Sequence, residues 1–455
     1  MTFVSFRFFA FLAAAAGIYA LLSPARRRPF LLAVSCFFYA AWSPAHLALL
    51  LAAAGVSYWA GLRIAAAGTE KKMERTAAVA ILVLLASLSL FKYSGRNWLV
   101  PVGISYYTFK LISYVVDVYW GKIPPERDFV SFAAYVAFFP QILSGPIQRA
   151  VDFLPQLSRA GAASPENIGE GLRLILFGLF QKVVVADSLA LIVDQIYRSP
   201  GAHHGWPLLF AIDCFFLQLY ADFSGLTDIA IGAALLFGIR SPQNFDAPFY
   251  APNLKEFWLR WHMTLTTWLL DYVFTPLRML LRYQGLLGLG ASIFLTMLAI
   301  GLWHGASANF LIYGAASGVC LVISIMSLPA RDRFFNKHPL LSSLRKFTAP
   351  LGTFHVMALS LVFFRSATVS DALSVFRNLA MPSAADPSLT ASFRPDAVYL
   401  LIAAVLVMEA VHIYRKSEAF RSLPRVVSLA CDAALLFFLL ISSGPPSKQF
   451  IYFRF

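Results

Sequence analysis

The sequence predicts an all-α polytopic membrane protein, and three observations support this fold class. Only 13% of the 455 residues are charged, whereas soluble proteins carry about 25%. Hydrophobic residues make up 59% of the chain, and its mean hydropathy is +0.68. Apolar runs recur from one end to the other, and the polar stretches between them are too short for a soluble domain. We therefore expect one integral membrane domain over residues 1–455.

The apolar runs define the candidate spans in chain order. They are 3–22, 30–43, 46–66, 77–91, 98–119, 129–146, 170–196, 206–238, 286–303, 305–328, 349–366, 398–414 and 426–443. A full crossing needs about 20 apolar residues, and several runs are shorter or contain proline and glycine. We expect about 11 transmembrane helices, together with re-entrant and interfacial helices whose backbone is buried in protein. No internal repeat is visible, so an inverted-repeat transporter is not supported.

The first apolar run resembles a signal peptide. Its front carries one arginine, Arg7, whereas Arg26, Arg27 and Arg28 follow the run directly. Basic residues favour the cytoplasmic side of a span. This charge order predicts an uncleaved first span that begins outside the cell and ends inside it.

The last third of the chain shows the clearest charge bias. Basic residues dominate the predicted loops 331–346 and 415–425, whereas acids balance them in 367–397. The positive-inside rule then places the first two loops in the cytoplasm and the third outside. The C-terminal hexapeptide FIYFRF, residues 450–455, would therefore lie outside.

The net charge of +14 is consistent with this topology. It would also attract anionic membrane lipid, coenzyme A or an acidic carrier protein. No nucleic-acid motif accompanies it, so we expect no nucleic-acid partner. The four cysteines are scattered in apolar runs, and His203 and His204 are expected in an exposed loop, so we predict no metal site.

Two Trp-His pairs are candidates for chemistry. In residues 254–277, read as one amphipathic helix, Trp261 and His262 share a broad aromatic face. His262 is either a buried structural histidine or a site residue. The second pair lies in GLWHGASANFLIYG, residues 301–314, which contains Trp303, His304 and Asn309. An imidazole there is costly in a membrane and is a functional candidate. Burial would keep it neutral and able to act as a base, although interhelical packing is the alternative.

Acidic residues also occur inside apolar runs. Asp222 should pair with a base or line a wet cavity. The neighbouring Asp222–Gly225 stretch, with Ser224, is a local break in helix propensity. Lys182 and Asp187 are five residues apart and should face different sides of one helix, so we expect their partners on other helices. No P-loop, GxGxxG, HExxH or GxSxG motif is present.

Seven segments have a recognisable pattern, and they are 101–121, 138–149, 176–190, 218–232, 244–272, 301–314 and 361–373. Together they resemble the membrane-bound O-acyltransferase (MBOAT) family, in its bacterial branch of alginate O-acetylation and teichoic acid D-alanyl transfer proteins. The resemblance implies a ring of tilted helices around a central funnel. It also implies a bacterial inner-membrane enzyme with His304 as the catalytic residue and His262 as its companion.

The resemblance also implies the reaction. An acyl group would pass from a cytoplasmic thioester donor, either acetyl-CoA or the phosphopantetheine of an acyl carrier protein, to an extracytoplasmic hydroxyl. No permanently bound cofactor is expected. His304 would act as the general base, and His262, Trp303 or a nearby donor would stabilise the oxyanion. The expected site-lining residues are Trp303, Asp222, Ser224, Trp261 and Asn309.

The same resemblance gives the C-terminal hexapeptide a role. Tyr452 would thread into the funnel from outside and carry the acyl group until an extracytoplasmic SGNH-type acyltransferase takes it. The alternative is an aromatic belt that ends the last helix.

Three alternatives remain open at the level of sequence. The stretch DYVFTPLRMLLRYQG, residues 271–285, lacks the Gly-Gly-Asn-Arg turn of alginate-type relatives, so the acyl group could be acetyl, which we favour, or D-alanyl. A membrane transporter or polymer conduit would explain the intramembrane acids without catalysis. A non-catalytic scaffold would recruit a separate acyltransferase.

Overall fold

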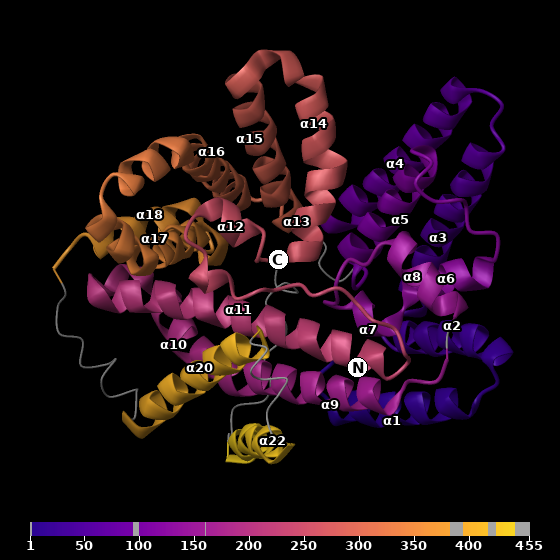
Figure 1. The fold of residues 1–455 in the computed structure, drawn as a ribbon, viewed down its shortest axis with the longest axis horizontal. Helices are drawn as coiled ribbons and strands as arrows, with labels where there is room; N and C mark the ends of the chain where they lie inside the picture. The colour runs from indigo at the N-terminus through magenta and orange to yellow at the C-terminus, as the bar shows by residue number, and fades with distance from the viewer. Residues whose placement is uncertain (1, 94–99, 160, 383–394, 417–424, 442–455) are drawn as a thin grey trace. The chain divides into compact units, whose positions relative to one another are not determined.

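A computed structural model describes residues 2–93, 100–159, 161–382, 395–416 and 425–441, and every regular element in these ranges is a helix. The predicted all-α class is therefore confirmed (Figure 1). Contacts divide the chain into two compact units. Unit 1 comprises Met1–Gly178 and Leu226–Gln243, and unit 2 comprises Leu179–Gly225 and Asn244–Phe455.

Unit 1 is built from the N-terminal helices. They are α1 (Phe6–Leu21), α2 (Pro24–Ala40), α3 (Pro44–Ala65), α4 (Glu70–Tyr93), α5 (Ile104–Tyr119), α6 (Phe129–Ala137), α7 (Phe139–Ile142), α8 (Ala150–Ser158) and most of α9 (Pro165–Leu179). Helices α3, α4 and α5 pack on one another (Figure 1). The candidate span 129–146 is interrupted, because the chain leaves helical geometry at Phe138 before the proline at 140.

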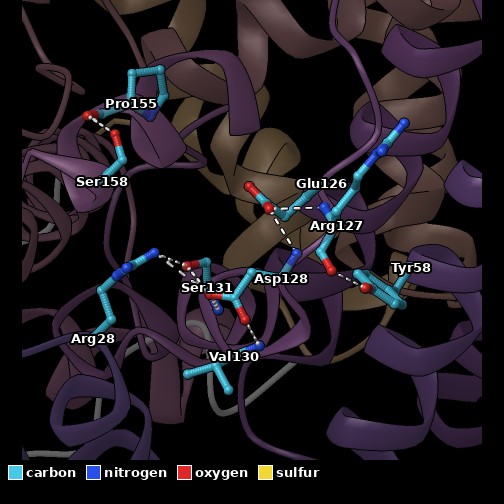
Figure 2. A network of polar contacts seen from close by, with 9 residues as sticks. All are labelled: Arg28, Tyr58, Glu126, Arg127, Asp128, Val130, Ser131, Pro155 and Ser158. Carbon is cyan, nitrogen blue, oxygen red and sulfur yellow. Dashed lines mark hydrogen bonds and ion pairs between the residues drawn. The ribbon is translucent and has the colours of Figure 1, made fainter. Parts of the chain in front are cut away.

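The start of α6 is fixed by a polar network (Figure 2). The Asp128 carboxylate accepts the Ser131 N–H at 3.3 Å and its hydroxyl at 2.7 Å, which caps the helix. Arg28 of α2 lies 3.6 Å from the same carboxylate. Glu126 accepts the Asp128 N–H at 2.9 Å, and Tyr58 of α3 donates to the carbonyl of the residue between them at 2.6 Å. These bonds attach the connection before α6 to helices α2 and α3.

Unit 2 contains the remaining elements. They are η2 (Phe180–Ala186), α10 (Asp187–Arg198), η3 (Pro200–Ala202), the first part of α11 (Trp206–Leu235), η4 (Pro248–Tyr250), α12 (Leu254–Trp258), α13 (Met263–Leu269), η5 (Leu270–Phe274), α14 (Thr275–Leu280), η6 (Arg282–Gln284), α15 (Gly285–His304), α16 (Ala308–Asn336), α17 (Pro339–Arg365), α18 (Val369–Leu379), α20 (Pro395–Lys416) and α22 (Arg425–Ile441). Helix α16 packs between α15 and α17 (Figure 1).

Seven of the described helical stretches are long and apolar enough to cross a membrane. They are Pro44–Ala65, Glu70–Tyr93, Pro165–Arg198, Trp206–Leu235, Arg282–His304, Ala308–Asn336 and Pro339–Arg365. Shorter apolar helices occupy Phe6–Leu21, Leu401–His412 and Leu429–Ile441. The protein is a multi-pass membrane protein, and the count of about 11 crossings stays a prediction.

Three local predictions are wrong. The stretch around Ser224 does not break α11, which is continuous from Trp206 to Leu235, because its side chains are packed in a buried interior that overrides weak propensity. Residues 331–346 are helical rather than a loop: only two residues separate α16 from α17, and Arg345 pairs with Asp332 at 2.9 Å. His203 is buried rather than exposed, in a connection that α18 holds through the carbonyl of Asn378.

Helices α15 and α16 of unit 2 approach each other closely at Gly301. A Cβ added to Gly301 would lie 2.3 Å from the Phe310 carbonyl oxygen and 3.0 Å from the Cα of Gly314. Small residues at such positions let two helix backbones come together. Because Gly301 lies one turn before the end of α15, this contact fixes where the last residue of that helix, His304, is placed.

Gly301→Ala should therefore destabilise the protein. Overpacking of this kind costs about 1–3 kcal/mol, and we expect a clearly lower Tm in detergent. Gly55→Ala in α3 is the matched control, because nothing lies within 4 Å of its added Cβ; it should be neutral or stabilising by up to about 1 kcal/mol. Equal melting temperatures for the two variants would contradict the close packing of α15 and α16.

Candidate active site

His262 lies at a break in the segment that the sequence suggested was one helix. Helix α12 ends at Trp258, and α13 begins at Met263. His262 itself has φ 42° and ψ 53°, in the left-handed region. Such a conformation costs a non-glycine residue about 1–3 kcal/mol and is found mainly at functional sites. The amphipathic helix predicted over 254–277 is therefore wrong, and the break turns the imidazole into the interior, where it is 2% exposed.

Backbone pairing with residues 244–246 holds this break in place. The Met263 N–H donates to the Asn244 carbonyl at 2.8 Å, and the Asp246 N–H donates to the Arg260 carbonyl at 2.9 Å. These bonds satisfy polar backbone groups that the broken helix cannot pair internally. The strained geometry at His262 is thus compensated by a second segment of the same unit.

Asn244 also sets the tautomer of His262. Its Oδ1 accepts the backbone N–H of Thr264 at 3.2 Å and the Thr264 hydroxyl at 2.9 Å. A backbone N–H can only donate, so the atom that faces it is the amide oxygen. His262 Nδ1 lies 2.9 Å from this same oxygen and must therefore carry the proton. Nε2 is left as the basic nitrogen.

The surroundings of His262 are aromatic. Its ring contacts Phe223 of α11 edge-on at 4.6 Å and Trp303 of α15 at 6.1 Å between centroids. Burial lowers the pKa of His262 to about 3, so the imidazole is neutral throughout the physiological pH range. A neutral ring with a fixed Nδ1 proton can accept a proton or a hydrogen bond at Nε2.

His304 is the last residue of α15 and is 6% exposed. Aromatic rings enclose it: Trp303 at 4.6 Å, Phe310 at 6.1 Å, Tyr313 at 5.8 Å and Phe364 at 4.9 Å between centroids. The next residue must be glycine, because a Cβ at position 305 would lie 2.5 Å from the Phe310 ring. The enclosure excludes bulk water from the imidazole, which strengthens electrostatic interactions there.

The structure brings three of the predicted site residues together. Trp303 contacts the rings of both His262 and His304, so the indole adjoins the two imidazoles. Trp261 instead belongs to a packed aromatic cluster, in which it stacks on Phe257 with centroids 5.5 Å apart.

The other predicted residues take different positions. Ser224 is buried in α11, 3% exposed. Asn309 is 5% exposed and donates its Nδ2 to the Ser366 carbonyl at 2.7 Å. Tyr452 lies outside the described residues.

Asp222 belongs to a buried ion-pair cluster. Lys182 Nζ lies 2.8 Å from Asp187 Oδ1 and 2.9 Å from Asp222 Oδ1, and all three side chains are at most 4% exposed. The prediction that Lys182 and Asp187 face different sides of a helix is wrong, whereas the expected partner on another helix is confirmed in Asp222. The reason is the π-helix Phe180–Ala186, whose i→i+5 hydrogen bonds align residues five apart.

Comparison with known proteins identifies the family. Residues 126–345 match the membrane-bound O-acyltransferase family. A probable alginate O-acetylase of Pseudomonas fluorescens is 37% identical over 335 residues, which cover 72% of this chain and 67% of the relative. The chain belongs to the membrane-bound O-acyltransferase family. It is a membrane O-acyltransferase, as the sequence motifs predicted.

Two further relatives carry different named activities. A peptidoglycan O-acetyltransferase of Helicobacter pylori is 29% identical, and the alignment covers 77% of this chain and 73% of the relative. A teichoic acid D-alanyltransferase of Bacillus subtilis is 30% identical, and the alignment covers 50% of this chain and 59% of the relative. This acyltransferase is thus similar to enzymes that are named for two different acyl groups, acetyl and D-alanyl.

Sequence reasoning missed Asn244, although the residue falls in a segment that matches the family. The signal was weak because an asparagine after a predicted helix usually indicates a turn. Only the folded arrangement shows that its side-chain oxygen collects the donors of His262 and Thr264.

The buried ion-pair cluster gives a stability prediction for this acyltransferase. Lys182→Met leaves two buried carboxylates without their cation, so we expect a loss of about 3–5 kcal/mol, seen as a lower Tm in detergent. Arg240→Met is the control, because Arg240 and its partner Glu170 are 59% and 50% exposed and lie 3.1 Å apart; exposed pairs contribute about 0–1 kcal/mol. Similar effects of the two substitutions would show that the cluster is not stabilising.

Proposed function

We propose that this acyltransferase moves an acetyl group from a cytoplasmic thioester to an extracytoplasmic hydroxyl, for the acetylation of a cell-envelope or secreted polysaccharide. The observation that carries the proposal is the position of His304 at the end of α15, enclosed by aromatic rings and linked through Trp303 to His262. A buried imidazole in such a setting is matched to general-base chemistry. Metal ligation is not part of the proposed mechanism.

The proposed reaction is a direct acyl transfer. His304 removes the proton of the acceptor hydroxyl as its oxygen attacks the thioester carbonyl. A C–O bond forms, the C–S bond breaks, and the imidazolium returns the proton to the departing thiolate, whose pKa as a free thiol is about 8.5. The thioester is a substrate, supplied either as acetyl-CoA or on the phosphopantetheine of an acyl carrier protein.

The oxyanion needs a donor, and Trp303 is the residue we assign. The indole Nε1–H can only donate, and its ring lies next to that of His304. His262 cannot donate from Nε2 in the tautomer that Asn244 imposes. We therefore propose that His262 positions Trp303 by ring contact and offers Nε2 as a hydrogen-bond acceptor, for example to the acceptor hydroxyl.

The choice of an acetyl group is supported by the relatives. Those named as alginate or peptidoglycan O-acetylating enzymes align over 72% and 77% of this chain, whereas the D-alanyltransferase aligns over 50%. D-alanyl transfer from a carrier protein is the alternative activity. A conduit or a non-catalytic scaffold is the alternative of another class, and both predict no thioester chemistry in the purified protein.

The proposed location is the inner membrane of a bacterium, with the N-terminus and the C-terminal hexapeptide outside. The charge distribution supports this orientation, because basic residues gather at the adjoining ends of α16 and α17. They are Arg331, Arg333, Lys337, Arg345 and Lys346. That end would face the cytoplasm and its anionic lipids.

The C-terminal hexapeptide supplies the proposed acceptor. Residues 450–455 contain a single tyrosine, Tyr452, in an otherwise aromatic and basic sequence. The acyl group would form an ester with its phenol and would then pass to the polysaccharide through an extracytoplasmic SGNH-type acyltransferase. This relay rests on the family resemblance and on the charge-derived orientation.

His304→Ala should abolish most acyl transfer. Loss of a general base costs about 10²–10⁴-fold in rate, and we would measure it with purified protein and a radiolabelled acetyl thioester. His338→Ala is the control, because this exposed histidine precedes α17 at the opposite end of α16. If the His304 variant transferred acetyl as fast as the control, the proposed catalytic role would be wrong. If the wild type consumed neither acetyl nor D-alanyl thioesters, a conduit or scaffold would replace the enzyme.

Tyr452→Phe should remove polysaccharide acetylation in cells while leaving the protein in the membrane. The substitution keeps the aromatic ring and deletes only the acceptor oxygen. Tyr283→Phe is the control, because this tyrosine is 83% exposed on η6 and lies outside the proposed relay. Normal acetylation of the polymer in the Tyr452 variant would rule out the relay without affecting the assignment of His304.

A further inference from the structure

Unit 2 contains a cavity of about 330 Å³ that the mechanism above does not use. Ligand pockets in proteins range over about 300–1,000 Å³, so this cavity has the size for one small ring rather than for a stretch of polymer. Aromatic side chains and polar side chains both line it. The main ones are Phe215, Phe310, Phe364, Gln218, Asn309 and Ser366.

Three polar atoms of this lining lack a hydrogen-bond partner within the described part of the chain. They are Gln218 Oε1, Asn309 Oδ1 and Ser366 Oγ. Their side chains belong to residues that are only 7%, 5% and 9% exposed, respectively. Leaving such an atom unsatisfied costs about 1–3 kcal/mol, so three around one cavity make it suited to a polar ligand.

The orientation of the Asn309 amide is fixed by the structure. Its Nδ2 donates to the Ser366 carbonyl at 2.7 Å, which leaves Oδ1 as an acceptor for a ligand. Ser366 Oγ and the Gln218 amide can each donate or accept. This set of acceptors and adaptable groups suits hydroxyl groups, which donate and accept in turn.

The cavity shares a wall with the catalytic candidate. Phe310 and Phe364 line the cavity, and their rings also contact that of His304 at 6.1 and 4.9 Å. A ring bound in the cavity would therefore lie directly behind the aromatic enclosure of His304.

The position of the cavity along α16 separates it from the basic end of unit 2. Asn309 lies at the beginning of α16, whereas the basic residues follow position 330. Helical rise makes this separation about 30–40 Å. Among the described residues that line the cavity, the charged ones are Asp194 and Arg365, which pair with each other at 2.8 Å. The cavity therefore has no excess positive charge to hold the phosphates of a thioester donor.

We propose that this cavity is the acceptor subsite, which takes a neutral hydroxyl-bearing ring, and that Gln218, Asn309 and Ser366 position it for His304. The inference rests on the proposed function. A phenol, such as a tyrosine side chain, and a sugar ring share the required chemistry. The cavity would open on the face away from the basic end, which is the extracytoplasmic face in the proposed orientation.

The test uses full-length Tyr452→Phe protein, so that acyl transfer to the chain itself does not consume donor. Acetyl transfer from a radiolabelled thioester is measured to N-acetyl-tyrosinamide in one arm and to methyl glucoside in the other. Asn309→Ala and Ser366→Ala should each raise the KM for the acceptor about 3–10-fold, as expected for one lost hydrogen bond, and should leave the KM for the donor within twofold. The arm that shows transfer identifies the source of the ring.

Asn378→Ala is the matched control for loss of a buried asparagine. Asn378 is also 5% exposed and donates its Nδ2 to a backbone carbonyl, that of Gly201, at 3.3 Å, but it does not line the cavity. An equal effect of this control would overturn the proposal, because general packing would then explain the result.

Other outcomes also decide the question. An increase in the donor KM, an unchanged acceptor KM, or donor hydrolysis without transfer to either ring would overturn the subsite while leaving the enzyme intact. A protein that neither hydrolyses nor transfers the thioester would instead contradict the proposed function itself.

Discussion

The close approach of α15 and α16 at Gly301 and Gly314 determines the geometry of unit 2 around its histidines. A side chain at either position would separate the two backbones, and the Phe310 and Tyr313 rings would then no longer meet His304. Within a membrane, association of helices depends on packing and not on the hydrophobic effect. The position of the imidazole therefore depends on two missing side chains, those of Gly301 and Gly314.

Polar groups in this interior are held by local departures from α-helical geometry. The left-handed residue His262 turns a ring inward and requires the backbone of residues 244–246 to complete its hydrogen bonds. The π-helix Phe180–Ala186 brings Lys182 onto the same side as Asp187. In both cases the distortion is unfavourable in isolation. It persists because the alternative, an unpaired polar group in an apolar interior, costs more.

These departures also explain which features the sequence could predict. Long apolar runs predicted the helices α3, α11 and α15 close to their observed bounds, because burial and length dominate there. The glycine-flanked WHG segment indicated His304, since an imidazole between apolar runs is unusual. The break at His262 and the alignment of Lys182 with Asp187 could not be predicted, because periodicity assumes 3.6 residues per turn and both depend on tertiary partners. Asn244, Gln218 and Ser366 have no sequence signature of their own.

The distribution of charge along α16 is consistent with the proposed direction of transfer. A thioester donor carries phosphates and would bind where arginines and lysines gather, at the end that includes Arg331 and Lys337. A neutral hydroxyl gains nothing from such a field and instead needs directed hydrogen bonds, which the cavity near Asn309 offers at the other end of the helix. The two substrates therefore suit opposite ends of unit 2. In the proposed mechanism the aromatic enclosure of His304 adjoins the neutral end, so the acceptor would need little reach. A donor held at the basic end would need a long, thin arm, which is the form that a pantetheine thioester has.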